Sequence, residues 1–402
     1  MNILEEIQNC SVEWKELGEV CDYEQPTRYI VSSKAYDDSN DIPVLTAGQS
    51  FILGYTNETD GIYRASNNNP VIIFDDFTTS KQWVDFKFKV KSSAMKILTI
   101  KDEFENEVLL RYVWHYLGTI TYKPDQHGRQ WIGTYSKFLI PIPPRETQEK
   151  IVQTLDKFTD YVTELTSELT SRKKQYSYYR DKLLSFEDEV YQVEWKTLGE
   201  VAECLAGATP RTSNSSYWEN GTIPWMSSGE VNKGFVYDTE KKITQEGYDS
   251  CSTKVVPIDT VVIALAGQGK TRGTVAITKV ELCTNQSLCS IVSNDDINSH
   301  YLYYYLKGQY QKLRDISSGE GTRGGLNLKM IRDFRIPVPS LEIQSRIVQV
   351  LDNFDMVCNN LNIGLPKEIE LRQKQYEYFR NKLLTFTAEG VYTDCTVQTR
   401  PD

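Results

Sequence analysis

The chain has 402 residues, of which 40% are hydrophobic and 25% are charged, which is ordinary for a globular protein of two or three domains. Its formal net charge of −10 argues against an evenly basic nucleic-acid-binding surface, although it leaves room for local basic loops. No run of eighteen apolar residues predicts a membrane span, and the first residues lack the basic and apolar regions of a signal peptide, so neither is expected.

The cysteines and histidines do not predict a metal site. The eight cysteines and three histidines are scattered, and no two cysteines form a C-x-x-C pair. Zinc sites need closely spaced ligands, so we expect no metal ligand set in this chain. Scattered, unpaired thiols are typical of a reducing compartment, which predicts a cytoplasmic location.

Sequence segments recur in the same order in the two halves of the chain. Val12-Glu-Trp-Lys-Glu-Leu-Gly-Glu-Val20 recurs as Val193-Glu-Trp-Lys-Thr-Leu-Gly-Glu-Val201. Four more pairs follow: 42–48 with 223–229, 70–74 with 260–264, 110–117 with 299–306, and 138–143 with 334–339. The second of these pairs is a short apolar run typical of a buried strand, and the third predicts a short helix. The order of the pairs predicts a tandem duplication.

Each half ends in a long segment with the apolar pattern of a coiled coil. Between Arg145 and Phe186, apolar residues recur at alternating spacings of four and three, and the segment that ends at Phe386 repeats the pattern. Residues 172–186 align with 372–386 without a gap. A long helix with one apolar seam needs a partner helix, so the two are predicted to pack together. The second copy holds four additional residues near 363–366, and their glycine and proline predict a kink or a break.

These patterns predict an α+β fold in which two globular domains are each followed by a long helix. The predicted division is 1–144 for the first globular domain, 145–188 for the first helix, 189–339 for the second globular domain, 340–388 for the second helix and 389–402 for a tail.

Two polar loops in each half are candidates for ligand binding. One follows the central strand, at 75–83 and 265–273, and the other precedes the Ile-Pro-x-Pro segment, at 123–132 and 317–328. Arg, Lys, Gln and Asn side chains bond base edges and phosphates, and glycine permits close backbone approach. Ordinary hairpin loops with solvated side chains are an equally compatible interpretation. The candidate DNA-binding residues are Thr79, Ser80, Lys81, Gln82, Arg129 and Gln130 in the first half, and Gln268, Lys270, Thr271, Arg272, Arg323 and Asn327 in the second.

The chain shows no recognisable catalytic motif. Gly269-Lys270-Thr271 is similar to the end of a phosphate-binding loop, but Ala264 stands where that motif requires its first glycine. The acidic pair Asp75-Asp76 has no downstream partner typical of a metal-dependent nuclease, so turn capping is the better interpretation. We therefore expect a protein that is not itself an enzyme.

The repeated motifs closely resemble the DNA specificity subunit of Type I restriction-modification systems. They are Leu-Gly-Glu-Val, Gly207-x-x-Pro210, Ile223-Pro-Trp225, and Ile-Pro-x-Pro followed by Gln-x-x-Ile-Val-x-x-Leu-Asp. The resemblance extends from Val12 to Phe386. It departs from the family at the helix start, where Thr147 and Ile343 replace the usual glutamate before glutamine.

This resemblance implies two target recognition domains that each read one half of a bipartite site in double-stranded DNA. It implies that the long helices form an antiparallel coiled coil with pseudo-twofold symmetry. It further implies modification subunits that bind S-adenosylmethionine and methylate adenine, and restriction subunits that use ATP and magnesium and cut DNA. Those cofactors would belong to the partners, with none in this chain, in the cytoplasm of a bacterium or archaeon.

Two other functions are compatible with the residues alone. The chain could be a scaffold in which the helices join two protein-binding domains, which would suit the net charge of −10. It could also be an enzyme, such as a nuclease fused to recognition domains, whose active site has no recognisable motif. Sequence-dependent retention of DNA by the chain with its partners would exclude the scaffold, and incubation of the purified chain with DNA and a divalent metal would reveal a nuclease.

Overall fold

The computed structural model describes residues 4, 6, 7, 10–46, 51–122, 128–186, 193–267, 271–317, 325–359 and 363–386. Contacts divide the chain into unit 1, which is Met1–Thr166 with Glu368–Asp402, and unit 2, which is Ser167–Lys367. Both boundaries fall inside long helices, so each unit contains a globular part and pieces of the helices from both halves. The domain limits predicted from the sequence follow the repeat instead, and they stay a prediction.

The globular part of unit 1 is built on sheets that are antiparallel except for one parallel pair of strands. Its strands are β1 (Glu13–Glu16), β2 (Cys21–Glu24), β3 (Ile42–Leu45), β4 (Ile52–Thr56), β5 (Val71–Asp75), β6 (Lys81–Val84), β7 (Lys89–Val90), β8 (Met95–Ile100) and β9 (Leu139–Ile142). The helices are α2 (Leu17–Val20) and α3 (Leu110–Leu117), with short 3-10 turns η1 (Pro26–Tyr29), η2 (Asp102–Phe104) and η3 (Tyr135–Lys137). Four strands form a sheet in the order β2-β8-β5-β6, and a second sheet has the order β4-β3-β7, in which β3 and β7 are the parallel pair. Every residue of β5 is buried, as its apolar run predicts, and α3 packs on β5 and β6.

Unit 2 repeats this plan. Its strands are β10 (Glu194–Thr197), β11 (Ala202–Ala206), β12 (Ile223–Met226), β13 (Phe235–Val236), β14 (Lys241–Ile243), β15 (Val261–Ala264), β16 (Val275–Thr278), β17 (Cys283–Thr284), β18 (Leu288–Ser293) and β19 (Arg335–Val338). The helical segments are α5 (Leu198–Val201), η4 (Ser215–Tyr217), η5 (Ser228–Lys233), α6 (Gln245–Asp249), α7 (Ser299–Gly308), α8 (Tyr310–Asp315) and α9 (Leu328–Arg332). The larger sheet has the order β11-β18-β15-β16-β13, and the smaller one β14-β12-β17. The central strand β15 is fully buried, like β5.

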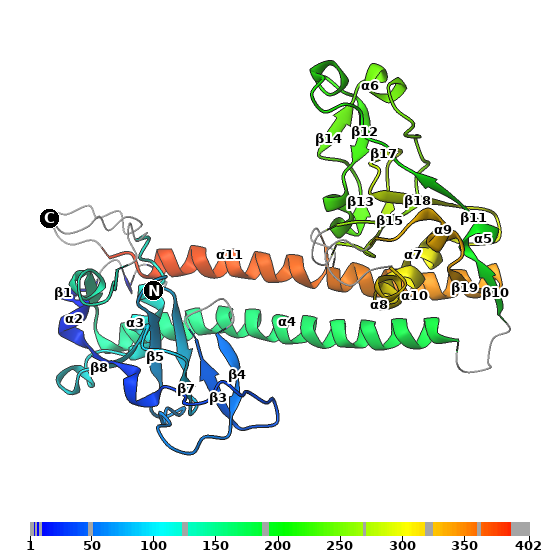
Figure 1. Cartoon of the computed structure of the whole chain (residues 1–402). Coiled ribbons are helices and arrows are strands. Elements are labelled where there is room, and N and C mark those ends of the chain that lie inside the picture. Colours follow the sequence, from blue (N-terminus) through cyan, green and yellow to red (C-terminus); the bar gives the residue numbers. More distant parts are fainter. Residues whose placement is uncertain are drawn as a thin grey trace. The chain divides into compact units, whose positions relative to one another are not determined.

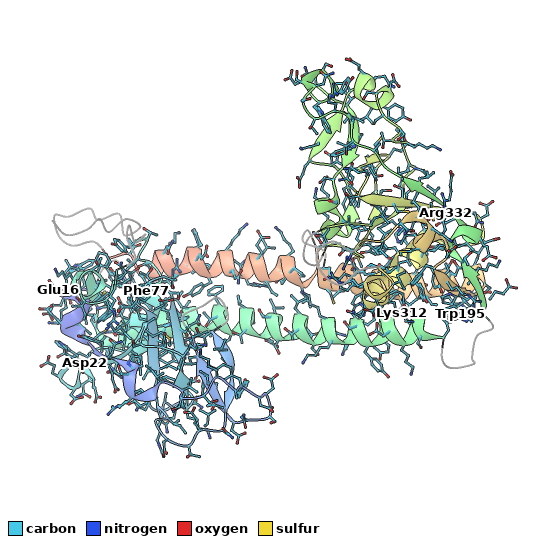
Figure 2. All side chains as sticks on the ribbon, viewed as in Figure 1. Glu16, Asp22, Phe77, Trp195, Lys312 and Arg332 are labelled. Carbon is cyan, nitrogen blue, oxygen red and sulfur yellow. The ribbon has the colours of Figure 1, made fainter. Side chains whose placement is uncertain are left out.

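The repeated motifs at the two ends of each half are strand partners. In unit 1, β1 pairs antiparallel with β9, which places Trp14 opposite Pro141. In unit 2, β10 pairs with β19 in the same register, which places Trp195 opposite Pro337. The Trp195 side chain is 47% exposed, and Figure 2 labels it beside this strand pair. The two motifs therefore recur together because each pair forms one two-stranded ladder that closes its globular part.

The long helices confirm the predicted seam and the predicted break. The first helix, α4, is continuous over Arg145–Ser185, as Figure 1 shows. The second segment consists of α10 (Leu341–Asn359) and α11 (Leu365–Leu383). Gly364 precedes α11 with a φ of 87°, a left-handed conformation that glycine adopts without strain. The additional residues of the second copy thus interrupt the helix.

Within each unit, pieces of the two long segments pack antiparallel. In unit 1, Phe158 of α4 stacks on Phe379 of α11 with ring centroids 5.1 Å apart, while Arg372 lies over Tyr161. In unit 2, Phe354 of α10 stacks on Tyr179 of α4 at 5.8 Å. Phe158 and Phe354 are equivalent in the repeat, so each unit uses the same aromatic contact to join its helices.

Within the described ranges, no helix is both long enough and apolar enough to cross a membrane. In the same ranges, His, Cys, Asp and Glu side chains nowhere gather in threes in a way that could hold a metal ion. The described cysteines are free thiols.

Candidate nucleic-acid interface

The acidic pair at the end of β5 joins the two predicted loops of unit 1. Asp75 accepts hydrogen bonds from the backbone N–H of Phe77 at 2.9 Å and from the hydroxyl of Thr78 at 2.6 Å. The carbonyl of Asp76 accepts from Gln130 N–H at 2.9 Å, and its carboxylate accepts from Trp131 N–H at 2.8 Å. These bonds cap the turn after β5 and fix the second loop beside it. The capping role expected for Asp75 and Asp76 is confirmed.

A buried ion pair anchors this junction. Asp76 is fully buried, and its carboxylate lies 3.5 Å from the ammonium of Lys96, which is 1% exposed. A buried carboxylate needs such a partner because desolvation of an isolated charge is costly. Both loops of unit 1 are therefore anchored to the core of the globular part.

Three of the predicted DNA-binding residues in unit 1 are exposed to solvent. Ser80 and Gln82 are exposed at the first loop, and Arg129 is exposed at the second. Phe77, at the tip of the first loop, is 40% exposed and is labelled in Figure 2. This combination of polar side chains and one aromatic ring on two joined loops suits contacts to base edges and phosphates.

The other three predicted residues of unit 1 point inward or support the loop. Thr79 has a φ of 59° and donates its hydroxyl to the carbonyl of Thr78 at 2.7 Å. Gln130 is 6% exposed and donates from Nε2 to the carbonyl of Gly128 at 2.8 Å. The ammonium of Lys81 lies 4.2 Å from the ring centroid of Trp114. Whether these residues contact DNA stays a prediction.

The two predicted loops of unit 2 also meet at the end of the central strand. The carbonyl of Leu265, just after β15, accepts a hydrogen bond from Leu326 N–H at 2.8 Å. Asn327 caps α9 by accepting from Met330 N–H at 2.9 Å. Arg272 is 9% exposed and Thr271 is half-buried. The remaining predicted residues lie outside the described part of the chain: Gln268, Lys270 and Arg323. The assignment of DNA contacts in this unit likewise stays a prediction.

A buried glutamine at the start of each long helix holds the short helix of the globular part. Gln148 is fully buried; its Oε1 accepts from Leu109 N–H at 3.0 Å, and its Nε2 donates to the carbonyls of Glu107 at 2.8 Å and Pro143 at 2.9 Å. Gln344 of unit 2 is also fully buried and makes the three equivalent bonds. Each glutamine is the first residue of the motif Gln-x-x-Ile-Val-x-x-Leu-Asp. The spacing within this motif does not indicate that the glutamine holds the short helix. The recurrence of the two glutamines at equivalent positions was the available signal.

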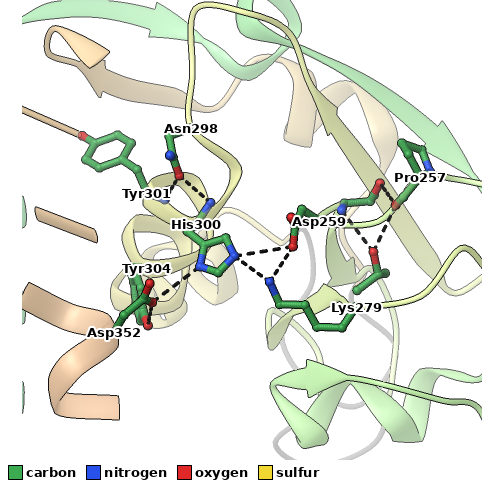
Figure 3. A network of polar contacts seen from close by, with 10 residues as sticks. Pro257, Asp259, Lys279, Asn298, His300, Tyr301, Tyr304 and Asp352 are labelled. Carbon is green, nitrogen blue, oxygen red and sulfur yellow. Dashed lines mark hydrogen bonds and ion pairs between the residues drawn. The ribbon is translucent and has the colours of Figure 1, made fainter. Parts of the chain in front are cut away.

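The aspartate that ends the same motif bonds the face of the short helix. Asp156 of α4 accepts from Arg111 Nε at 2.8 Å and contacts His115 Nε2 at 2.8 Å. Asp352, its equivalent on α10, accepts from the hydroxyl of Tyr304 at 2.6 Å. Figure 3 shows this second network, in which the ring of His300 lies between Asp352, at 3.5 Å, and Lys279, at 2.6 Å. The motif Gln-x-x-Ile-Val-x-x-Leu-Asp therefore joins each long helix to a globular part.

His115, which stands where unit 2 has Tyr304, predicts a pH dependence for the network of unit 1. His115 is fully buried, and burial lowers its pKa to about 4, despite the opposing effect of the Asp156 carboxylate. Because the folded pKa lies below the ordinary value of about 6.5, the stability from neutral His115 is complete above pH 6.5 and is lost as the pH falls toward 4. Between pH 7 and 4.5 we expect a loss of roughly 2–3 kcal/mol from this group.

Urea unfolding at both pH values measures this loss in the wild-type chain and in His115→Tyr. The variant copies the hydroxyl that Tyr304 presents to Asp352, so it should keep the contact and lose that part of the pH dependence. Equal pH dependence in the two proteins would contradict the assignment to His115.

An open cleft of about 1060 Å³ lies beside the network of unit 2. Its lining includes Lys307, Tyr303, Asp352 and Asp355. The ammonium of Lys307 donates to the hydroxyl of Tyr303 at 3.1 Å and lies 3.9 Å from the Asp355 carboxylate. Lys307 is thus already paired with the carboxylate of Asp355 inside the cleft.

The long helices present large aromatic side chains to solvent. Tyr178 is 61% exposed, Tyr179 is 45% exposed and Tyr378 is 54% exposed, whereas Tyr176 is buried. Three of these four tyrosines are therefore exposed. Exposed aromatic side chains of this kind are enriched where proteins bind other proteins.

Comparisons with known proteins give the family. The family described as "Type I restriction modification DNA specificity domain" matches residues 11–172 and 192–371. The chain is 46% identical, over 96% of its length and 97% of the relative's, to the Type I restriction enzyme EcoR124I/EcoR124II specificity subunit of Escherichia coli. It is 29% identical, over 95% of its length and 97% of the relative's, to a putative Type I specificity subunit of Haemophilus influenzae.

Solved structures share the fold. A crystal structure of a Type I restriction-modification S subunit from M. genitalium matches with a TM-score of 0.60 and 15% identity, over 94% of this chain and 98% of that one. A chain from a study of complex assembly in the Type I system matches with a TM-score of 0.54 and 19% identity, over 93% of this chain and 97% of that one.

The fold and the loop pairs define a tandem α+β protein with one candidate recognition surface in each unit. The predicted fold class is confirmed by the two family matches and by the solved structures. The chain belongs to the Type I restriction-modification DNA specificity family.

Proposed function

We propose that this chain selects the DNA target of a Type I restriction-modification complex, and that each unit reads one half of a bipartite site. The observation that carries this proposal is the joining of two polar loops at the end of the central strand in both units, at Asp76 and at Leu265. Two loops that are joined in this way can present several side chains to base edges at once. The loop sequences differ between the units, which is what two different half-sites require.

The chemistry of the complex would reside in partner subunits. Modification subunits would bind S-adenosylmethionine and methylate adenine, and restriction subunits would use ATP and magnesium to translocate and cut DNA. The exposed tyrosines of the long helices offer a surface for the modification subunits. Such a complex would act on DNA in the cytoplasm of a bacterium or archaeon.

A gel-shift experiment with the chain and its modification subunits tests the function. We expect retention of a small sequence-defined fraction of a random duplex pool, and sequencing of that fraction should give two short motifs separated by unread positions. Retention without sequence preference, or none, would contradict the proposal and favour a scaffold. The family assignment does not favour the scaffold. Cleavage of DNA by the purified chain with a divalent metal would instead indicate a nuclease.

Replacement of one loop arginine should relax only one half-site. Arg129→Ala, in a loop of unit 1, should weaken discrimination in one half of the motif, because a lost base contact costs about 1–3 kcal/mol at its own position. Arg323→Ala should act on the other half. Sequencing the retained pool for each variant measures both effects.

Arg346→Ala provides a matched control for this prediction, because Arg346 belongs to the helix α10 and to neither loop, and its side chain is 75% exposed. It should leave both half-sites unchanged. Equal relaxation of both halves by either loop variant would contradict independent reading by the two units.

A further inference from the structure

Unit 1 contains a cluster of positive charge around Gly118. A Cβ atom at Gly118 would lie 3.0 Å from Nη1 of Arg380 and 3.1 Å from Nζ of Lys81. The backbone of Gly118 is right-handed helical, a conformation open to any residue, so these two cationic groups approach the chain where no side chain intervenes. Arg111 joins the cluster, since its guanidinium lies 4.3 Å from the same Trp114 ring that Lys81 covers at 4.2 Å.

The charge of this cluster is poorly compensated. The ammonium of Lys81 is buried and has no hydrogen-bond partner among the described residues. Burial, followed by the neighbouring charges of Arg380 and Arg111, holds the pKa of Lys81 well below its usual range. Arg111 is paired with Asp156, while Arg380 bonds the neutral amide of Asn381 at 3.1 Å. Keeping Lys81 charged here is costly unless an anion approaches it.

Unit 2 has a similar pair of cations, but one of them comes from a different secondary-structure element. Lys307 stands at the position of Gly118 in the aligned helices, and its ammonium lies 5.1 Å from the ring centroid of Tyr303, the equivalent of Trp114. Arg180 of α4 is the equivalent of Arg380. An ammonium beside this aromatic ring thus comes from β6 in unit 1 and from α7 in unit 2.

Unit 2 also supplies the carboxylates that unit 1 lacks. Asp355 lies 3.9 Å from Lys307, and Asp181 lies 2.7 Å from Arg180. The equivalent positions in unit 1 are Thr159 and Asn381, both neutral. The same cationic arrangement is therefore neutralised within the chain in unit 2 and left without these two carboxylates in unit 1.

We propose that the Lys81–Arg380 cluster of unit 1 is a docking site for an aspartate or glutamate side chain of the modification subunit. This inference rests on the proposed function, because it requires that subunit to bind the chain. Arg380 is half-buried at the helix surface, so an incoming carboxylate can bond its guanidinium and come within Coulombic range of Lys81. The docked carboxylate would replace the one that Asp355 supplies in unit 2.

The internal repeat favours a carboxylate over a DNA phosphate. In unit 2 the equivalent cations are neutralised by carboxylates, and one of these, Asp355, belongs to the long-helix segment. Part of the unit 1 cluster also belongs to such a segment, since Arg380 lies on α11. A purely structural function is the other alternative, because cations near the last turn of α3 stabilise the helix dipole.

Thr159→Asp tests the inference by supplying the missing carboxylate within the chain. The variant should raise the thermal stability of the free chain and weaken its affinity for the modification subunit by about tenfold or more, because the internal carboxylate occupies the cluster. Thr163→Asp is the matched control: it makes the same change one turn along α4, at an exposed position. It should alter neither property appreciably. Arg380→Gln should also weaken subunit binding.

The outcomes separate the alternatives. Unchanged subunit affinity in Thr159→Asp and Arg380→Gln would overturn the inference. Weaker DNA binding by the assembled complex with unchanged subunit affinity would overturn it in favour of a phosphate site, and a change in thermal stability alone would overturn it in favour of a structural role. If the wild-type chain does not bind the modification subunit at all, the proposed function itself fails.

Discussion

Gln148→Leu is expected to destabilise the chain by roughly 3–4 kcal/mol, because it removes three hydrogen bonds made by a fully buried side chain. The side chain of Gln148 is fully buried and bonds Leu109 N–H and the carbonyls of Glu107 and Pro143. Leucine fills a similar volume but can make none of these bonds. Urea unfolding of the purified chain, compared with the wild type, measures the loss.

Gln153→Leu provides the control, since it makes the same substitution at an exposed position of the same helix. It should change the free energy of unfolding by less than about 0.5 kcal/mol. The equivalent change in unit 2, Gln344→Leu, should match the effect of Gln148→Leu. A small effect of Gln148→Leu, close to that of the control, would show that the glutamine does not hold α3.

The features that the sequence predicted well are those that depend on local spacing. The alternation of four and three along 145–186 requires a helix with one seam, and α4 follows it almost to the predicted end. Gly364 and Pro366 predicted the interruption between α10 and α11 for a similar reason, because both residues act through their own backbone. The position of Asp75-Asp76 directly after an apolar strand predicted that the pair caps a turn.

The features that could not be predicted depend on which segments meet in space. Lys81 was a candidate for DNA contact from its place in a polar loop, yet its ammonium faces Trp114, which is distant in sequence. Arg272 looks like a solvated loop residue but is 9% exposed. The functions of Gln148 and Asp156 were hidden for the same reason, since their partners belong to the globular part. Comparison of the two halves identifies these positions, but contacts explain them.

Lengthening both long helices should change the spacing of the DNA target without changing the half-sites. We consider four residues inserted between Thr166 and Ser167 and four between Lys367 and Glu368, the two boundaries between the units. Four residues are slightly more than one helical turn, so contacts inside each unit, such as Phe158 with Phe379, are preserved. Each insertion adds about 6 Å of helix, which is close to two base pairs at about 3.4 Å each.

Methylation of a library of duplexes, with fixed half-sites and a variable gap, measures the preferred spacing in the assembled complex. The lengthened chain should prefer a gap that is one or two base pairs longer, because each insertion adds about 6 Å of helix at a boundary between the units. The same four residues inserted between Asn67 and Asn68, at an exposed turn of unit 1, should leave the gap unchanged. An active complex that keeps the original gap after both helix insertions would show that some other part of the assembly measures the DNA. The helices would then serve only to join the units and bind the partner subunits.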